Sequence, residues 1–410
     1  MKVVYLNPSG QLGGAEMALL DLMASIRRAE PEWVLSLIIG GVGPLEERAR
    51  AIGVDAMVLP LPGAVARLGD AGAGGSAGRQ LSRISLLRRL VLAAPAMIHY
   101  ASELTESLRV IAPDLIHTNG FKMHILGARA IPKIGIPLVW HVRDYVGARP
   151  FMARLMRVHV RRCAVVVTNS RSVADDVRAV CGDDVRICPL LDAIDIEKFS
   201  PTGNRLDLDR LAGLPEAEPG TIRVGLLATM ARWKGHKVFL SALSRLPGEL
   251  NVRGYVIGGA LYETEGSQYK LNELKDEAAR LGLSGKVGFT GFVEDAASAM
   301  RSLDIVVHAS TEPEPFGLVI AEAMACGRAL IASEAGGAAE IMTVGKNALG
   351  HKPGDVEGLS DCIARLATDG QLRKQLGEAG RATAKAHFDR ARLATELVPI
   401  YQTAGANRMK

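Results

Sequence analysis

Short runs rich in Val and Ile alternate along the whole chain with stretches in which apolar residues recur at helical spacing. In the first half these runs are residues 2–6, 34–39, 56–59, 114–117, 138–141, 165–168 and 185–188. In the second half they are residues 223–228, 252–257, 287–290, 305–308, 329–332 and 348–350. Most lack a polar–apolar alternation, as expected of strands covered on both faces. The pattern predicts βαβ units and parallel sheets, an α/β fold.

A chain of 410 residues exceeds the size at which one core keeps growing. We therefore expect two doubly wound, Rossmann-like domains, 1–195 and 196–388, followed by a C-terminal segment, 389–410. The boundary is placed in residues 192–219, which are rich in Pro, Gly and charge. A second irregular stretch, 63–78, is rich in Gly and Ala and predicts a mobile loop.

Composition narrows the function classes. Aromatic residues make up 4% of the chain, which argues against base-stacking nucleic-acid modules. The five cysteines show no C-x-x-C pair and no histidine at zinc spacing, so a reduced, cytoplasmic protein is expected. No apolar run reaches the ~18 residues of a membrane span, and the N-terminus does not resemble a signal peptide.

A glycine pair follows the first predicted strand. Gly13 and Gly14 come directly before an amphipathic helix that extends to about residue 29. Glycine lets the backbone approach a ligand closely, and a helix N-terminus favours an anion. The surrounding residues match neither the dinucleotide fingerprint nor a Walker loop. A phosphate-binding loop and a plain tight turn remain equal alternatives.

Two cations follow the first strand of the second half, where open α/β sheets bind ligands. Arg232 and Lys234 could pair with a diphosphate and stabilise it as a leaving group. A surface turn with two solvated cations is the alternative. Two strands later, Phe289 and Gly291 could form the wall of a nucleobase pocket, although Phe289 fits a core position equally well.

Two glutamates separated by seven residues dominate residues 312–340. Glu314 precedes a Pro-Phe-Gly turn, and Glu322 lies in the alanine-rich helix that follows. A carboxylate can accept hydrogen bonds from neighbouring sugar hydroxyls, and a glycine turn that opens a helix can hold phosphate on its amides. This strand–turn–helix unit predicts a nucleotide-sugar site.

In these motifs the chain resembles the retaining glycosyltransferases of family four, which have the two-domain GT-B fold. The resemblance covers nearly the whole length and is carried by segments 13–16, 141–144, 168–170, 233–235, 314–322 and 336–340. It implies transfer of a sugar from a nucleotide-diphosphate donor to a glycan, lipid-linked or small-molecule acceptor, with retention and without a metal or other cofactor.

The resemblance also implies that a C-terminal helix in 389–410 returns to the first domain, and it implies roles for individual residues. Glu322 would hold the ribose hydroxyls, Glu314 would face the transferred sugar, and Lys234 would bind the diphosphate. The backbone of Phe316, Gly317 and Leu318 would donate to sugar or phosphate, and Gly13 and Gly14 would close over the diphosphate. His141 ends a strand of the first domain and would face the cleft near sugar or acceptor. Attack on the front face of the sugar would leave Glu314 as a positioning group and not a covalent nucleophile.

The chain departs from the family pattern before the diphosphate lysine. The family often has an arginine five residues earlier, where this chain has Thr229, and Arg232 is the candidate substitute. This departure is the feature that favours a non-catalytic partner subunit. A nucleotide-sugar epimerase is a further alternative, for which no second acid–base pair is evident. The acidic triplet of Asp207, Leu208 and Asp209 has no preceding strand and is rejected as a metal motif.

Two basic helical stretches lie in the first half. One carries Arg79, Arg83, Arg88 and Arg89, and the other carries Arg154, Arg157 and Arg161. Solvated faces are the commoner explanation of such patterns. The alternative is contact with anionic headgroups or a lipid-linked acceptor at the inner face of the membrane.

Overall fold

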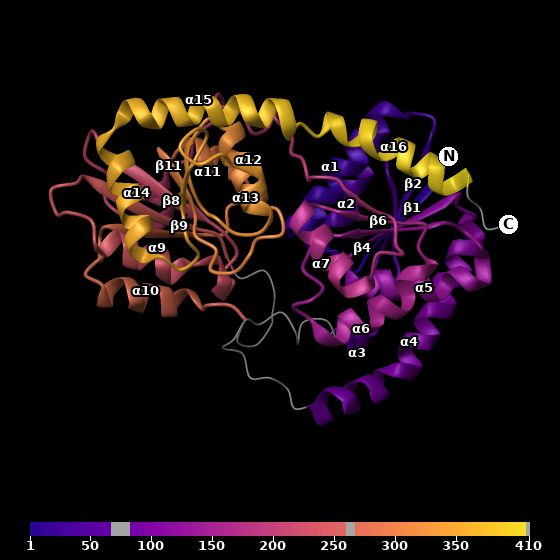
Figure 1. Ribbon diagram of the computed structural model, residues 1–410. Coiled ribbons are helices and arrows are strands. Elements are labelled where there is room, and N and C mark those ends of the chain that lie inside the picture. The colour runs from indigo at the N-terminus through magenta and orange to yellow at the C-terminus, as the bar shows by residue number, and fades with distance from the viewer. Residues whose placement is uncertain (67–82, 260–266, 407–410) are drawn as a thin grey trace. The chain divides into compact units, whose positions relative to one another are not determined.

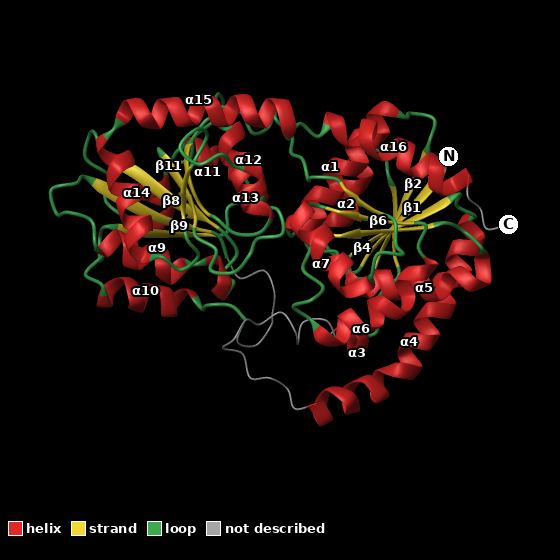
Figure 2. Ribbon diagram, in the orientation of Figure 1, coloured by secondary structure: helices red, strands yellow, loops and turns green. Residues whose placement is uncertain are grey.

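The computed structural model describes residues 1–66, 83–259 and 267–406 (Figure 1). These residues form two compact units, Met1–Ala193 with Arg390–Lys410 and Ile194–Asp389. Each unit is built on a parallel sheet with helices on its faces (Figure 2). The predicted fold class is therefore confirmed for both halves.

Seven strands form the sheet of the first unit, and each pairs with its neighbours in parallel. In spatial order they are β3 (Asp55–Val58), β2 (Val34–Ile39), β1 (Lys2–Asn7), β4 (Leu115–Asn119), β5 (Leu138–Val142), β6 (Val165–Thr168) and β7 (Ile187–Pro189). Strand β1 shows why these runs are apolar throughout. Val3 and Tyr5 enter the core on one face of the sheet, while Val4 and Leu6 enter the core on the other.

Helices cover both faces of this sheet. One core includes residues of α1 (Gly14–Ala29), α2 (Leu45–Ala51) and α16 (Ala391–Ala406). The opposite core includes residues of α3 (Gly63–Ala66), α4 (Arg83–Ile111), α5 (Phe121–Ile134), α6 (Pro150–His159), η2 (Val160–Arg162) and α7 (Arg171–Cys181). The stretch 63–78, expected to be irregular, thus begins with a short helix, and its remainder lies outside the described residues.

Six strands form the parallel sheet of the second unit. Their spatial order is β10 (Val287–Gly291), β9 (Val252–Ile257), β8 (Ile222–Leu227), β11 (Ile305–His308), β12 (Ala329–Ser333) and β13 (Leu349–His351). The chain runs from β8 outward through β9 to β10 and then returns to the other side of β8 at β11. The strand order therefore reverses between β8 and β11, the position at which open α/β sheets bind ligands.

The α-helices of the second unit range in length from 5 to 18 residues. They are α8 (Leu208–Ala212), η3 (Arg232–Lys234), α9 (His236–Ser244), α10 (Leu271–Arg280), α11 (Ala296–Arg301), α12 (Leu318–Ala325), α13 (Gly337–Ile341), α14 (Val356–Thr368) and α15 (Gly370–His387). Helices α9, α10 and α14 pack over one core of the sheet. Helix α15 packs on α12 and β12 (Figure 1).

The segment expected to be an interdomain linker belongs mostly to the second unit. Buried Arg301 donates to the carbonyls of Lys198 and Asn204, and the Leu206 amide donates to Ser302 Oγ at 2.7 Å. These bonds fasten the segment to α11, although its Pro, Gly and charge content resembles a free linker. Composition alone could not predict this because the fastening groups come from about 100 residues downstream.

The last helix, α16, completes the core of the first unit. Leu393, Leu397 and Tyr401 are buried there, and α16 contacts α1 and β4. The Ala394 amide donates to Ser25 Oγ at 3.0 Å, which ties α16 to α1. Within the described part of the chain, no helix is both long and apolar enough to cross a bilayer.

Candidate active site

The carboxyl ends of β8 and β11 bring together residues that lie far apart in the sequence. Lys234 belongs to η3, which follows β8, and Glu314 lies in the loop that follows β11. Because β8 and β11 are paired in parallel, both loops leave the same edge of the sheet. Lys234 and Glu314 therefore meet at the point where the strand order reverses.

Close backbone contact fixes the two loops against each other. Gly235 has a φ of 77°, and a Cβ built on it would lie 1.8 Å from the Ala309 carbonyl oxygen. Only glycine fits there, since its neighbour is backbone that cannot move aside. The Thr311 amide also donates to the Trp233 carbonyl at 2.7 Å. The lysine is thus held beside the glutamate loop by main-chain geometry.

Glu314 is held by charge and hydrogen bonds. Lys234 Nζ donates to both of its carboxylate oxygens, at 2.9 Å to Oε1 and 2.7 Å to Oε2. Ser310 Oγ donates to Oε2 at 2.9 Å, and His308 Nε2 lies 3.0 Å from the same oxygen. The carboxylate side chain is 9% exposed, so these donors replace most of its hydration.

Two opposing effects set the pKa of Glu314. Burial raises the pKa of a carboxyl group, because the charged form loses its water. The Lys234 charge and the hydrogen bond from His308 lower it more, and the net result is a pKa well below the ordinary value for glutamate. Glu314 is therefore an ionised carboxylate over the whole physiological pH range.

The Pro-Phe-Gly turn after Glu314 is tied to the loop that opens α13. The Gly337 amide donates to the Glu314 carbonyl at 2.7 Å, and a Cβ on Gly337 would lie 2.0 Å from the Pro315 carbonyl oxygen. Helix α12 then begins at Leu318, with Gly317 as its N-cap at a φ of 95°. The glycines at both ends of the motif are thus required by backbone approach and conformation.

The start of α12 offers backbone donors beside Glu314. Helix N-termini carry unpaired N–H groups and a partial positive charge, and both favour an anion. The side chain of Phe316 is buried against Phe388, with ring centroids 5.9 Å apart, so Phe316 can offer a ligand only its backbone. Leu318 is the first residue of the helix, and Glu322 lies one turn further along, half-buried.

Arg232 points to a different set of partners from those predicted. Its guanidinium pairs with Glu273 at 3.1 Å and lies 4.4 Å from the centroid of the Tyr269 ring. Both partners lie within or just before α10. The expectation that Arg232 serves the diphosphate in place of Thr229 thus stays a prediction.

Phe289 and Gly291 lie at the end of β10. Phe289 packs against the core shared by α9, α10 and α14, and it lines a recess together with Ala212 and Ala278. Gly291 has a φ of 70° and follows an irregularity in the pairing of β10 with β9. Phe292, the next residue, has an exposed fraction of 65%. A role for Phe289 or Gly291 at a nucleobase stays a prediction.

In the first unit, Gly13 and His141, which were expected to contact the donor or acceptor, interact with other residues of the same unit. The Gly13 amide donates to Glu16 Oε2 at 3.1 Å, while Gly14 is exposed at the start of α1. His141 was expected to face a cleft, but its side chain is buried, 1% exposed, with its ring edge-on to His117. Burial, followed by the charge of Arg143, lowers the pKa of His141 well below its ordinary value.

A buried charged pair at the carboxyl edge of this first sheet was not predicted from the sequence. Arg143 donates to Asp192, to Asn119 Oδ1 at 3.0 Å and to His141 Nδ1 at 3.2 Å. Because arginine can only donate, His141 Nδ1 accepts and its proton is on Nε2. His308 and Ser310 were likewise given no role. The available signal was the same in each case: a polar residue at the end of a buried strand.

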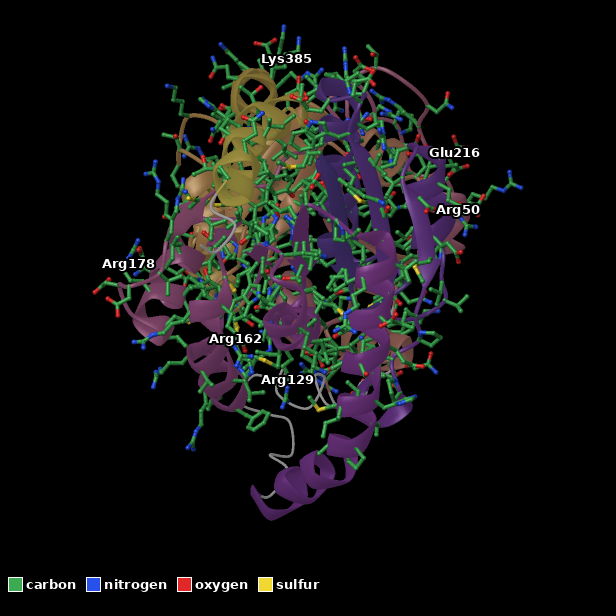
Figure 3. All side chains as sticks on the ribbon, turned by 90° about the vertical axis from the view of Figure 1, so that its right-hand side faces the viewer. Arg50, Arg129, Arg162, Arg178, Glu216 and Lys385 are labelled. Carbon is green, nitrogen blue, oxygen red and sulfur yellow. The ribbon has the colours of Figure 1, made fainter. Side chains whose placement is uncertain are left out.

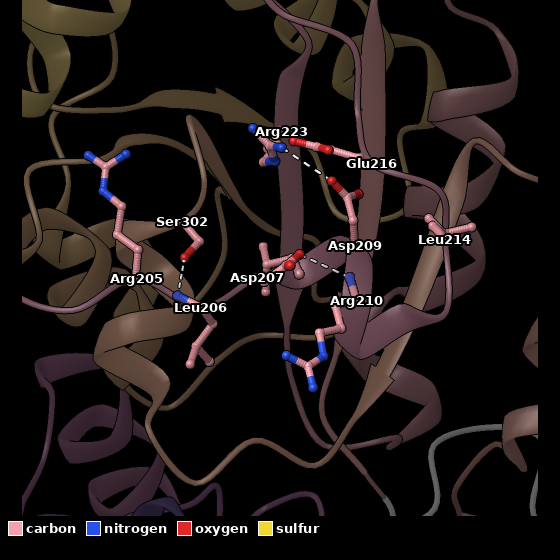
Figure 4. A pocket seen from close by; sticks show the side chains of 10 residues that line it. Arg205, Leu206, Asp207, Asp209, Arg210, Leu214, Glu216, Arg223 and Ser302 are labelled. Carbon is pink, nitrogen blue, oxygen red and sulfur yellow. Dashed lines mark hydrogen bonds and ion pairs between the residues drawn. The ribbon is translucent and has the colours of Figure 1, made fainter.

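The acidic triplet around Asp209 lines a recess of about 550 Å³ (Figure 4). Asp209 accepts hydrogen bonds from Arg253 at 2.7 Å, Tyr255 at 2.6 Å and Arg223 at 3.2 Å. Asp207 caps α8 by accepting from the Arg210 amide at 3.0 Å. Both carboxylates therefore have structural partners within the second unit.

Comparisons with known proteins agree with this architecture. Residues 216–383 match the family model of the glycosyl transferases group 1, and residues 46–198 match that of glycosyltransferase family 4. HepE of Anabaena, solved in complex with UDP and glucose, superposes with a TM-score of 0.78 and 25% identity, covering 98% of this chain and 100% of HepE.

Two curated relatives match over shorter lengths. The lipopolysaccharide core biosynthesis glycosyltransferase LpsE of Rhizobium meliloti is 31% identical over 48% of this chain and 53% of LpsE. The sulfoquinovosyl transferase SQD2 of Arabidopsis thaliana is 26% identical over 70% of this chain and 56% of SQD2. The chain thus spans little more than half the length of either relative.

The two Rossmann-like units and these matches define a protein of the GT-B class. Within that class, the chain belongs to the glycosyltransferases of family 4, as its sequence motifs indicated.

Proposed function

We propose that this protein transfers a sugar from a nucleotide-diphosphate donor to a glycan, lipid-linked or small-molecule acceptor, with retention of configuration and without a metal. The observation that carries the proposal is the Lys234–Glu314 pair, placed at the reversal of strand order and beside the start of α12. A cation, a helix N-terminus and a carboxylate are the groups that a sugar diphosphate requires.

The three groups divide the donor between them. Lys234 and the first amides of α12 bind the diphosphate and stabilise the negative charge that grows as the sugar departs. Glu314 accepts hydrogen bonds from hydroxyls of the sugar, and Glu322, one turn along α12, accepts them from the ribose. Lys234 leaves Glu314 in this step, since its single ammonium group sits on a flexible stem.

Retention follows without a covalent intermediate. Ser310 donates to Glu314 Oε2, and His308 Nε2 lies 3.0 Å from the same oxygen, so these two side chains fix the orientation of the carboxylate toward the sugar hydroxyls. We therefore assign Glu314 to positioning and electrostatic stabilisation. The acceptor attacks from the face that the diphosphate leaves, and a departing phosphate oxygen takes the acceptor proton.

UDP-sugars are the first donors to test, because HepE was solved with UDP and glucose. A thermal-shift panel of UDP-, GDP-, ADP- and TDP-sugars should show a clear rise in Tm for one nucleotide. Ligand at 100 times its Kd stabilises the folded state by about 2.7 kcal/mol. A panel without any shift, on protein shown to be folded, would reject the transferase proposal.

Metal independence has its own test. Lys234 and the start of α12 supply the positive charge that Mg²⁺ supplies in many phosphoryl enzymes. UDP release from UDP-glucose should therefore continue at an unchanged rate in excess EDTA. A loss of rate that Mg²⁺ or Mn²⁺ restores would contradict this part of the proposal.

One exposed face of α6 in the first unit supports the proposal that the acceptor is held at a membrane. On α6, Phe151, Arg154 and Val158 are exposed and recur at helical spacing, and Arg161 follows on η2 with its side chain 80% exposed. Arg162, labelled in Figure 3, donates to the Ala128 carbonyl of α5 at 3.1 Å. The side chains of Arg83, Arg88 and Arg89, and all of Arg79, lie outside the described residues.

Exposed apolar and basic side chains on one helix face suit an anionic lipid surface. We infer that α6 touches such a surface peripherally. Flotation with vesicles of phosphatidylglycerol should retain the protein at low salt, and the substitutions Arg154→Glu and Val158→Asp should release it. Absence from the vesicles at every salt concentration would reject this contact.

A further inference from the structure

The Glu314 carboxylate has more partners than Lys234 alone. His308, at the last position of β11, places Nε2 3.0 Å from Oε2, and Ser310 donates to the same oxygen at 2.9 Å. Ser310 Oγ also lies 3.0 Å from His308 Nε2. The three side chains form a closed triangle in which His308 is 4% and Ser310 1% exposed.

The arrangement fixes which atoms donate. A carboxylate whose pKa is lowered accepts only, so His308 carries its proton on Nε2. Ser310 Oγ also accepts a hydrogen bond from that N–H, and its own O–H donates to Oε2. Oε2 thus has two donors on the strand side, while Lys234 approaches from η3 and bonds both oxygens.

Donor binding removes the strongest of these interactions. Under the proposed function, Lys234 turns to the diphosphate, and Glu314 remains in a buried place without its counter-ion. Burial alone raises the pKa of a carboxyl group and favours its neutral form. A neutral Glu314 would present a proton where a lone pair is needed for the sugar hydroxyls.

We propose that His308 and Ser310 are positioning residues that keep the Glu314 carboxylate ionised and oriented while Lys234 is engaged with the diphosphate. This inference rests on the proposed function, because it needs Lys234 to leave Glu314. The two residues act through Glu314 and do not touch the donor.

The ionisation of Glu314 gives a test that does not depend on an acceptor. The carboxyl ¹³C signal of Glu314, assigned by its loss in Glu314→Gln, is followed against pH with and without UDP. Lys234 and His308 are titratable side chains within hydrogen-bond distance of this carboxyl group, so Lys234→Met is titrated in parallel.

Wild-type Glu314 should stay ionised to below about pH 4 with UDP bound. In the double variant His308→Leu/Ser310→Ala with UDP bound, its titration midpoint should rise by at least about one pH unit, and by less without UDP. A double variant that titrates like the wild type in the presence of UDP overturns the inference. Wild-type protein that does not bind UDP overturns the proposed UDP-sugar donor and this inference with it.

Kinetics separate a positioning role from a structural one. His308→Leu should lower the kcat of UDP release from UDP-glucose about 10- to 100-fold, since a hydrogen bond to a charged group is lost. The Kd for UDP should change by less than about threefold. His308→Gln retains an N–H donor and should recover most of the rate.

Ser333→Ala is the matched control for Ser310→Ala. Ser333 is also buried at the end of a central strand, β12, but its hydroxyl has no hydrogen-bond partner in the described structure. Its removal should leave both kcat and Kd unchanged. Equal losses in Ser310→Ala and Ser333→Ala would mean that packing at the strand ends, and not the bond to Glu314, sets the rate.

Discussion

Each of the two sheets carries a buried ion pair at its carboxyl edge, and the two pairs are built differently. In the first unit, the planar guanidinium of Arg143 is fixed by Asp192, Asn119 and His141 at once. In the second, the point charge of Lys234 sits on a flexible stem against Glu314. Arginine suits a permanent frame, and lysine suits a contact that is exchanged for a ligand. The difference indicates that the Arg143 pair stabilises the first unit, whereas the Lys234 pair can open to bind a ligand.

The largest expected effect concerns the Arg143 pair. Arg143→Met keeps the volume of the side chain but leaves Asp192 buried without its cation, so the free energy of unfolding should fall by roughly 3–5 kcal/mol. Urea denaturation followed by circular dichroism measures this loss. Arg178→Met removes an exposed pair with Asp175 and should change stability by less than about 1 kcal/mol. A stability loss no larger than in Arg178→Met would erase the contrast between the two units.

Glu314→Ala tests the Lys234 pair. UDP release from UDP-glucose should slow by about 10²–10³-fold, as happens when a preorganised electrostatic group is removed. The affinity for UDP should stay within about threefold, because Glu314 is assigned to the sugar and not to the nucleotide. Isothermal titration and steady-state kinetics give the two numbers. An equally large loss of UDP affinity would show that Glu314 belongs to the nucleotide site.

Glu322→Ala should show the reverse pattern. Losing the ribose hydrogen bonds should weaken UDP binding about tenfold, with a smaller change in kcat at saturating donor. Glu340→Ala, on the neighbouring helix α13, provides a comparison in which a carboxylate is removed from a different helix. Similar losses of affinity in both variants would mean that general negative charge, and not Glu322 itself, is being measured.

The smallest effect is expected for Arg232→Ala. Its ion-pair partner Glu273 is exposed, so losing that pair should change both kcat and the Kd for UDP by less than about threefold. A loss as large as that in Lys234→Met would show that Arg232 also binds the diphosphate, so that two cations serve the site.

Much of the fold could be predicted from the sequence. Buried parallel strands require continuous apolar runs, and every predicted run forms a strand, with ends within two residues. The meeting of Lys234 with Glu314 was also accessible, because both follow strands of one sheet whose ends share an edge. The helix after Glu314 also leaves a local signal, whereas the return of the last helix was implied by the family resemblance.

The remainder depends on contacts between distant segments. The Arg232 guanidinium pairs with Glu273, 41 residues further along the chain, and the sequence near Arg232 does not indicate that partner. The ring of buried His141 packs edge-on against His117, and His117 Nδ1 in turn lies 2.6 Å from Tyr401 OH, 284 residues further along the chain. Local pattern cannot weigh such competing partners. For the same reason, His308 and Ser310 were visible as strand-end residues but not as partners of Glu314.

The position of α16 has a consequence for synthesis. The core of the first unit is incomplete until the residues beyond 390 have been synthesised, since Leu397 and Tyr401 of α16 pack beside α1 and Trp33. During synthesis on the ribosome, the apolar face of the first unit that α16 covers therefore stays exposed to water until the whole second unit has been translated. Folding of the half made first is completed by the part made last, which gives chaperones a defined surface to protect in the interval.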